Sequence, residues 1–164
     1  MRRLGATCVF RNFRDEIQMS AASLFAWIAT VLVGLLLLVI WLMEYDPQFQ
    51  STAATRLPIP VISTHALLGM AGLVLWGAYL LADEDRLAYA TLVDLGIAAA
   101  LGLTMAARWI GVYRKYRTAP QRDPAATQVV TVPPERHFPL SAVVLHGVLA
   151  VTTIGLVLLT FFTD

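Results

Sequence analysis

The sequence predicts an all-α integral membrane protein, a four-helix bundle whose helices cross the bilayer in up-down-up-down order. Hydrophobic residues make up 58% of the 164 residues and charged residues 14%, whereas soluble domains carry about 25% charged residues. The apolar residues form four continuous runs, at about 21–43, 58–82, 87–109 and 139–162. Each run reaches the roughly 20 residues that an α-helix needs to cross the hydrocarbon core. Backbone groups in lipid must be hydrogen-bonded internally, so these runs are predicted to be helices.

The first run, 21–43, follows a polar tail at 1–20 and opens a transmembrane domain that extends over 21–164. The run is too long for the core of a signal peptide and no small-residue cleavage pattern follows it, so we expect a retained helix. The tail holds the single cysteine, Cys8, which excludes an intrachain disulfide. Met19 directly precedes the run, and translation starting there would remove most of the tail.

Short and long links alternate between the other runs. The second and third runs are joined by the tight acidic turn 83–86, which predicts an antiparallel hairpin. The loop at 44–57 is polar and leads into the second run through Pro58, a residue suited to the start of a helix. The third and fourth runs are separated by the longest loop, 110–138, which we expect to be irregular.

The distribution of Lys and Arg bears on orientation. Side A, the face with the loops 44–57 and 110–138, carries seven of these residues, and side B, with both termini and the turn 83–86, carries five. That difference does not decide orientation. If translation begins at Met19, only Arg86 remains on side B, and side A is then expected to be cytoplasmic, with the protein spanning the cell membrane.

A short motif occurs twice in the apolar runs. Pro58 is followed seven residues later by His65, and Pro139 is followed at the same spacing by His146. Both motifs start on side A, so each histidine lies about 10 Å below its proline and the two are level. The second and fourth helices are diagonal neighbours in such a bundle. The bundle is therefore predicted to consist of two hairpins related as a weak internal repeat.

Two level histidines on diagonal helices favour a shared haem b, because imidazole is a standard axial ligand of haem iron. Small residues follow the histidines at helical spacing, Gly69 and Gly72 after His65 and Ala150 after His146, and would leave a slot for the porphyrin. The third run adds a stripe of small residues that includes Gly102. Arg108, at the side-A end of that run, is placed to meet the propionates.

Two other roles for the histidines stay open at this stage. Small residues also line ordinary contacts between transmembrane helices, and a packed histidine can hydrogen-bond a nearby Ser, Thr or carbonyl group. A metal ion without haem is a further alternative, although no carboxylate or cysteine is placed to complete its shell.

Asp94 is the other ionisable residue within a run, in the side-B half of the third one. Carboxyl groups at membrane depth often mark proton or ion pathways. The alternative is that Asp94 is neutral or reaches toward the side-B interface.

Several function classes are excluded by missing motifs. The sequence contains no phosphate-binding glycine loop, no His-Glu-x-x-His, no nucleophile elbow and no basic nucleic-acid module, which argues against a hydrolase, a nucleotide-driven pump or a nucleic-acid-binding protein. We expect an electron-transfer or accessory subunit rather than an enzyme by itself.

The runs from 58 to 162, with histidines facing inward in a short bundle, resemble small four-helix membrane b-type cytochromes and the haem-carrying membrane anchors of respiratory dehydrogenases. The resemblance is one of architecture and includes no family-specific motif. It implies electron transfer through a haem with His65 and His146 as axial ligands, and respiratory-chain subunits or quinone as partners. The competing functions are a non-catalytic accessory or scaffold subunit, and a small transporter that uses Asp94 and the histidines.

Overall fold

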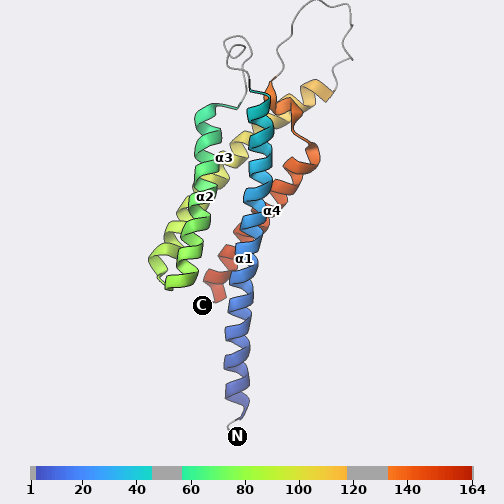
Figure 1. The fold of residues 1–164 in the computed structure, drawn as a ribbon. Helices are drawn as coiled ribbons and strands as arrows, with labels where there is room; N and C mark the ends of the chain where they lie inside the picture. Colours follow the sequence, from blue (N-terminus) through green and yellow to red (C-terminus); the bar gives the residue numbers. More distant parts are fainter. Residues whose placement is uncertain (1–2, 46–56, 118–132, 164) are drawn as a thin grey trace, which may run out of the picture.

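The computed structural model describes residues 3–45, 57–117 and 133–163, and it is an all-α four-helix bundle as predicted. The helices are α1 (Arg3–Met43), α2 (Ile59–Ala82), α3 (Asp85–Arg117) and α4 (Leu140–Thr163), and a short 3-10 helix, η1 (Pro134–His137), precedes α4. Figure 1 shows the up-down-up-down order, with both termini at the end that carries the α2–α3 turn. The remaining parts of the two long loops lie outside the described residues.

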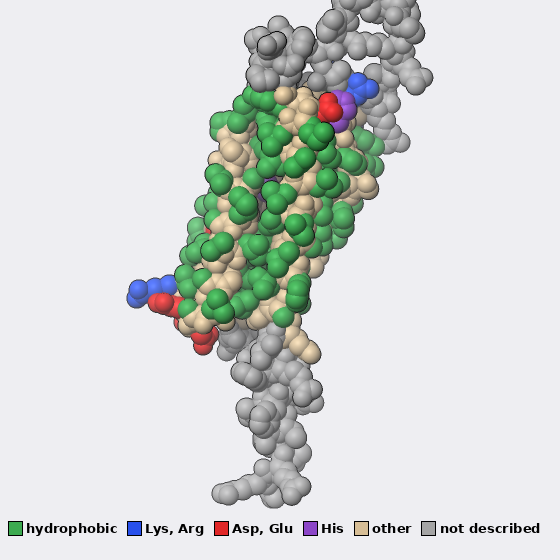
Figure 2. Space-filling model, viewed as in Figure 1, with side chains coloured by type: hydrophobic (Ala, Val, Ile, Leu, Met, Phe, Trp, Pro, Cys, Tyr) green, Lys and Arg blue, Asp and Glu red, His purple; other side chains and the backbone are tan. Residues whose placement is uncertain are grey.

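All four helices contain segments long and apolar enough to cross a membrane. These are Gln18–Met43, Ile59–Ala82, Asp85–Lys115 and Leu140–Phe161. In Figure 2 the side of the bundle is covered by apolar side chains, and the charged side chains gather at its two ends. A band of exposed apolar side chains between polar ends is the surface of a protein that spans a bilayer.

Two helices are longer than the predicted membrane spans. α1 begins at Arg3, within the polar tail. α3 continues past Trp109 to Arg117, so this part of the predicted irregular loop is helical. The extension retains an inner face, because Trp109 and Val112 are both buried at helical spacing. Basic residues at its end also suit the negative end of the helix dipole.

The starts of α2 and α4 have the same geometry. The carbonyl oxygen of Pro58 accepts hydrogen bonds from the N–H groups of Val61 and Ile62. The carbonyl oxygen of Pro139 accepts the corresponding bonds from Ala142 and Val143. Proline fits here because the first turn of a helix leaves its N–H groups without intrahelical partners.

The α2–α3 turn depends on one residue in the left-handed conformation. Asp83 has φ 51° and its N–H bonds to the carbonyl oxygen of Tyr79, which closes the end of α2. Asp tolerates this conformation better than most non-glycine residues, and α3 then begins at Asp85.

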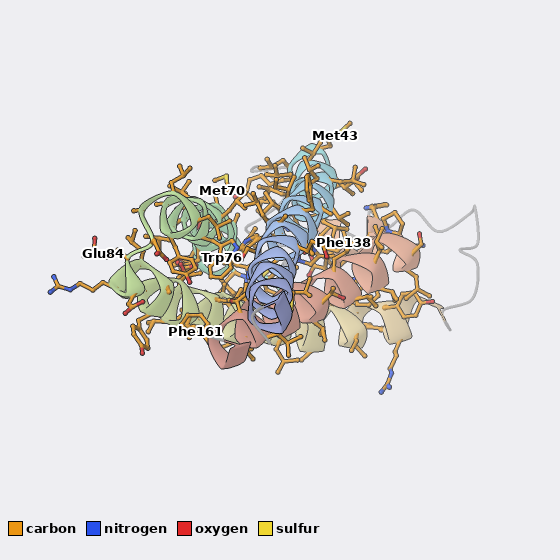
Figure 3. The ribbon with its side chains drawn as sticks, turned by 90° about the horizontal axis from the view of Figure 1, so that it is seen from below. Met43, Met70, Trp76, Glu84, Phe138 and Phe161 are labelled. Atoms are coloured by element: carbon orange, nitrogen blue, oxygen red, sulfur yellow. The ribbon has the colours of Figure 1, made fainter. Side chains whose placement is uncertain are left out.

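The bundle consists of two layers, α1 packed with α4 and α2 packed with α3. The layers meet mainly where α1 contacts α2, whereas α3 and α4 touch little. Trp27, Trp76 and Val157 form a core in the side-B half, and Trp41, Leu57 and Ile62 form another in the side-A half. Trp76 extends from α2 toward α1 (Figure 3), where its Nε1 donates to Ser23 Oγ at 2.9 Å. The two cores leave the middle of the bundle to the histidines.

Candidate functional site

The structure brings His65 and His146 together between the two layers. Their ring centroids lie 6.1 Å apart and the ring planes are inclined by 75°. Both side chains are only partly buried, and Figure 2 shows histidine atoms (purple) between apolar side chains at mid-height. The predicted level pair on diagonal helices is therefore present in the fold.

Each imidazole is held by a backbone carbonyl of the other helix in its own layer. His65 Nδ1 lies 2.9 Å from the carbonyl oxygen of Ala98 in α3. His146 Nδ1 lies 3.0 Å from the carbonyl oxygen of Thr30 in α1. A carbonyl oxygen only accepts hydrogen bonds, so Nδ1 carries the proton in both rings and a neutral ring keeps its lone pair on Nε2.

A glycine lies against each imidazole, one helical turn after the carbonyl that holds it. A Cβ atom added to Gly102 would stand 2.9 Å from Cε1 of His65. A Cβ atom added to Gly34 would stand 2.9 Å from Cε1 of His146. Cβ atoms essentially never approach so closely, so glycine is the residue that permits each ring to come this near to its neighbouring helix. The carbonyl and the glycine together fix the direction of each ring.

The internal repeat extends to α1 and α3. Gly34 is followed seven residues later by Trp41 and then by Tyr45 after four more, and Gly102 is followed at the same spacings by Trp109 and Tyr113. Both Trp–Tyr pairs are in ring contact, with centroids 4.7 Å and 5.1 Å apart. The two halves of the chain thus share the pattern Gly-x6-Trp-x3-Tyr followed by Pro-x6-His.

Sequence reasoning missed Gly34 and the carbonyls of Thr30 and Ala98. The Gly-x6-Trp-x3-Tyr pattern is legible in the sequence and would have paired Gly34 with Gly102. The carbonyls leave no such signal, because every residue has one and only the packing of the layers selects which of them meets an imidazole.

The other predicted site residues have different surroundings. A Cβ atom added to Gly69 would have no other atom within 4 Å. Ala150 is partly buried, one helical turn after His146. Gly72 instead lies against the Asp94 carboxyl group and the Trp27 ring, so its small size serves that packing. Arg108 is exposed at the side-A end of α3. Of the small residues predicted to form a slot, Gly72 is thus occupied by packing, whereas Gly69 has no neighbour within 4 Å of an added Cβ.

Asp94 is nine-tenths buried in the side-B half of the bundle, with 9% of its surface exposed. Its Oδ2 atom is buried and has no hydrogen-bond partner in the structure. The Trp27 ring beside it is fixed by a 3.0 Å bond from Nε1 to the carbonyl oxygen of Gly69. Asp94 does not join the histidines in one cluster, since the described residues contain no group of three or more His, Cys, Asp or Glu side chains able to hold a metal ion.

Comparisons of the chain with models of protein families, with curated proteins and with solved structures gave no match in any of the three. The geometry of the histidine pair is therefore the feature of the molecule that points to a function.

Proposed function

We propose that the protein is a membrane electron-transfer protein or subunit that holds one haem b between its two layers, with His65 and His146 as axial ligands. The observation that carries this proposal is the pair of level imidazoles 6.1 Å apart, each with Nδ1–H bonded to a backbone carbonyl. A haem in this position would supply a one-electron couple at mid-bilayer depth.

The separation of the rings fits two ligands on opposite sides of one metal. Bonds from a metal to an imidazole nitrogen are about 2.0 Å long, and the nitrogen lies about 1 Å from the centre of its ring. Two trans imidazoles therefore have centroids about 6 Å apart, close to the observed 6.1 Å. An edge-to-face pair of rings without a metal has centroids about 4.5–7 Å apart, so the distance supports the proposal only together with the hydrogen bonds.

The hydrogen bonds favour ligation over simple packing. Histidines that bind metals almost always donate their other ring N–H to a carbonyl or carboxylate, which fixes the tautomer and the ring direction. Both histidines do so here, and the described residues give neither Nε2 atom a hydrogen-bond partner. An Nε2 lone pair without a hydrogen bond is available to a metal ion.

The packing between the layers and the duplicated histidine surroundings also support a haem over a bare metal ion. A Cβ atom added to Gly69 would meet no atom within 4 Å, and α3 and α4 make few contacts with each other. A bare metal ion is less well served, because a third protein ligand is absent from the described part of the chain. Other membrane subunits or quinone are the partners that this function requires.

The experiment is a reduced-minus-oxidised visible spectrum of the protein purified in detergent after expression with adequate haem. We expect the sharp α-band of low-spin haem b, lost in His65→Ala and in His146→Ala taken singly. His137→Ala is the control, since this histidine is exposed on side A, and it should keep the band. A flat spectrum from folded protein, or a low-spin band retained in either membrane-histidine variant, would overturn the proposal and leave a membrane subunit without an assigned cofactor.

A further inference from the structure

Asp94 is a buried acid that the proposed haem site does not use. It lies on α3 one turn before Ala98, the residue whose carbonyl holds His65. Its Oδ2 atom is buried without a hydrogen-bond partner. An ionised carboxyl group in such a place is unstable unless a positive charge lies near it, so buried acids in membranes are rare and tend to be functional.

Asp94 packs closely against Gly72 of α2 and the Trp27 ring of α1. Oδ2 lies so near Gly72 that an added Cβ there would overlap it, and the same Cβ would stand 2.6 Å from the Trp27 ring. These contacts close the Gly72 side of the Asp94 carboxyl group. The chemistry that the carboxyl group itself can supply is the gain or loss of a proton.

Few other charges share the interior with Asp94. The membrane-spanning part of α1, 18–43, has no titratable side chain, and the only His, Asp, Glu, Lys or Arg in α2 and in α4 are His65 and His146. The tyrosines nearest in sequence are Tyr79 and Tyr89, on α2 and α3, and the charged residues of the turn 83–86 are exposed at the side-B end. The haem iron would thus be the dominant variable charge near Asp94.

We propose that Asp94 takes up one proton when the haem is reduced, which makes the protein a proton-coupled electron carrier; this inference rests on the proposed haem site. Reduction of a bound haem by one electron from a one-electron reductant would be balanced by one proton from the side-B water, which would convert the Asp94 carboxylate to the acid. The haem core with its two neutral imidazoles carries one positive charge before reduction and none after it. The loss of this positive charge removes the electrostatic attraction that favours the ionised Asp94 carboxylate.

The proton is assigned to side B because Asp94 lies in that half of α3. Thr91, one turn nearer to side B, is fully buried and polar. Ser23 of α1 is a second fully buried hydroxyl group in the same half of the bundle. These two hydroxyl groups lie in the side-B half together with the apolar core of Trp27, Trp76 and Val157, whereas the histidine level lies between Asp94 and side A.

The test is the midpoint potential of the haem as a function of pH, measured by spectroelectrochemistry in detergent. In the pH window where one proton accompanies the electron, the equilibrium constant changes tenfold per pH unit, which is about 59 mV. We expect this slope in the wild type and a flat profile in Asp94→Asn. The matched control is Asp83→Asn, which removes an exposed carboxylate at a left-handed position that Asn also tolerates, and it should keep the slope.

A second measurement uses only the wild type, in case Asp94→Asn does not fold. The redox-induced infrared difference spectrum should show a carboxylic acid C=O band that appears on reduction and shifts in D₂O. A wild-type potential that does not depend on pH, a slope retained in Asp94→Asn (which would assign it to the propionates), or the absence of the band would each overturn the inference while leaving the haem in place. A protein that contains no haem would instead remove the proposed function itself.

Discussion

The two halves of the chain, α1–α2 and α3–α4, are alike on one side of the bundle and different on the other. From the histidines to side A they repeat the same parts: a glycine against an imidazole, a Trp–Tyr ring pair and a proline at the start of a helix. Toward side B the matching positions diverge. Asp94 corresponds to Ala26, Gly72 to Thr153, and Trp76 to Val157.

This contrast distinguishes the parts of the fold that position the two histidines from the parts that do not. An arrangement that serves one ligand on each side of a shared centre has to be duplicated, and the duplicated parts are those that fix the imidazoles. The side-B half carries no such demand. There the first hairpin provides a large buried ring, Trp76, and the second provides a buried acid, Asp94, which has no counterpart at the matching position, Ala26.

The largest expected effect on haem binding comes from adding a methyl group beside each imidazole. In Gly34→Ala and in Gly102→Ala the new methyl group would stand 2.9 Å from a histidine ring, and the ring must shift from the position in which its carbonyl holds it. Overpacking of this kind costs about 1–3 kcal/mol, so each variant should bind haem about 10–100-fold more weakly. The measurement is haem titration of the apoprotein, followed by the low-spin α-band.

Glycines that face open space supply the controls for this pair. Gly77 and Gly155 have no neighbour within 4 Å of an added Cβ, so Gly77→Ala and Gly155→Ala should bind haem as the wild type does. If the two halves are equivalent, Gly34→Ala and Gly102→Ala should weaken binding to a similar degree. If only one of these two variants bound haem more weakly, the two halves would share a sequence pattern without contributing equally to haem binding.

A smaller effect, on the free energy of unfolding, is expected at a position where the two halves of the chain differ. Ser23 and Thr91 occupy matching positions and are both fully buried, but only Ser23 serves another helix, by accepting the Trp76 N–H bond. Ser23→Ala leaves that N–H buried and unpaired, which should lower the free energy of unfolding by about 1–3 kcal/mol.

Thr91→Val is the matched variant on the other half. The Thr91 hydroxyl bonds only to the Leu87 carbonyl of its own helix, and valine keeps the shape, so the loss should stay below about 1 kcal/mol. Both variants are compared with the wild type by thermal unfolding in detergent, followed by loss of helix signal. Equal losses would mean that the Trp76 bond to Ser23 contributes nothing beyond the hydroxyl itself.

The fold was accessible from sequence because the bilayer imposes a length and a composition on each helix. Runs such as 58–82 and 139–162 need no tertiary information, and the prolines mark where α2 and α4 begin. The end of α3 was harder to predict from the sequence. The hydrophobic run ends at the basic residues after Trp109, whereas the helix continues because its inner face remains buried at Val112.

The site could be predicted only in its outline. A shared depth for His65 and His146 follows from the rise per residue. Which helix packs with which does not, and this choice, α1 with α4 and α2 with α3, determines that Thr30 and Ala98 hold the rings. Gly72 looked like a slot residue because small residues look alike in sequence, and only packing shows that Trp27 and Asp94 use its space.

The smallest expected effect lies at the side-A end, where the repeat breaks again. Glu44 follows α1 and contacts His137 of η1, with 3.5 Å between Oε2 and Nδ1 and 45% of each side chain exposed. The matching position after Gly102 is Val112, which is buried at 1% exposure. Exposed ion pairs contribute about 0.2–1 kcal/mol, so Glu44→Gln should hardly change thermal unfolding in detergent. Val112→Ala removes apolar contacts and should cost about 1–2 kcal/mol. A Glu44→Gln loss as large as that of Val112→Ala would mean that the contact between α1 and η1 holds the two halves together at this end.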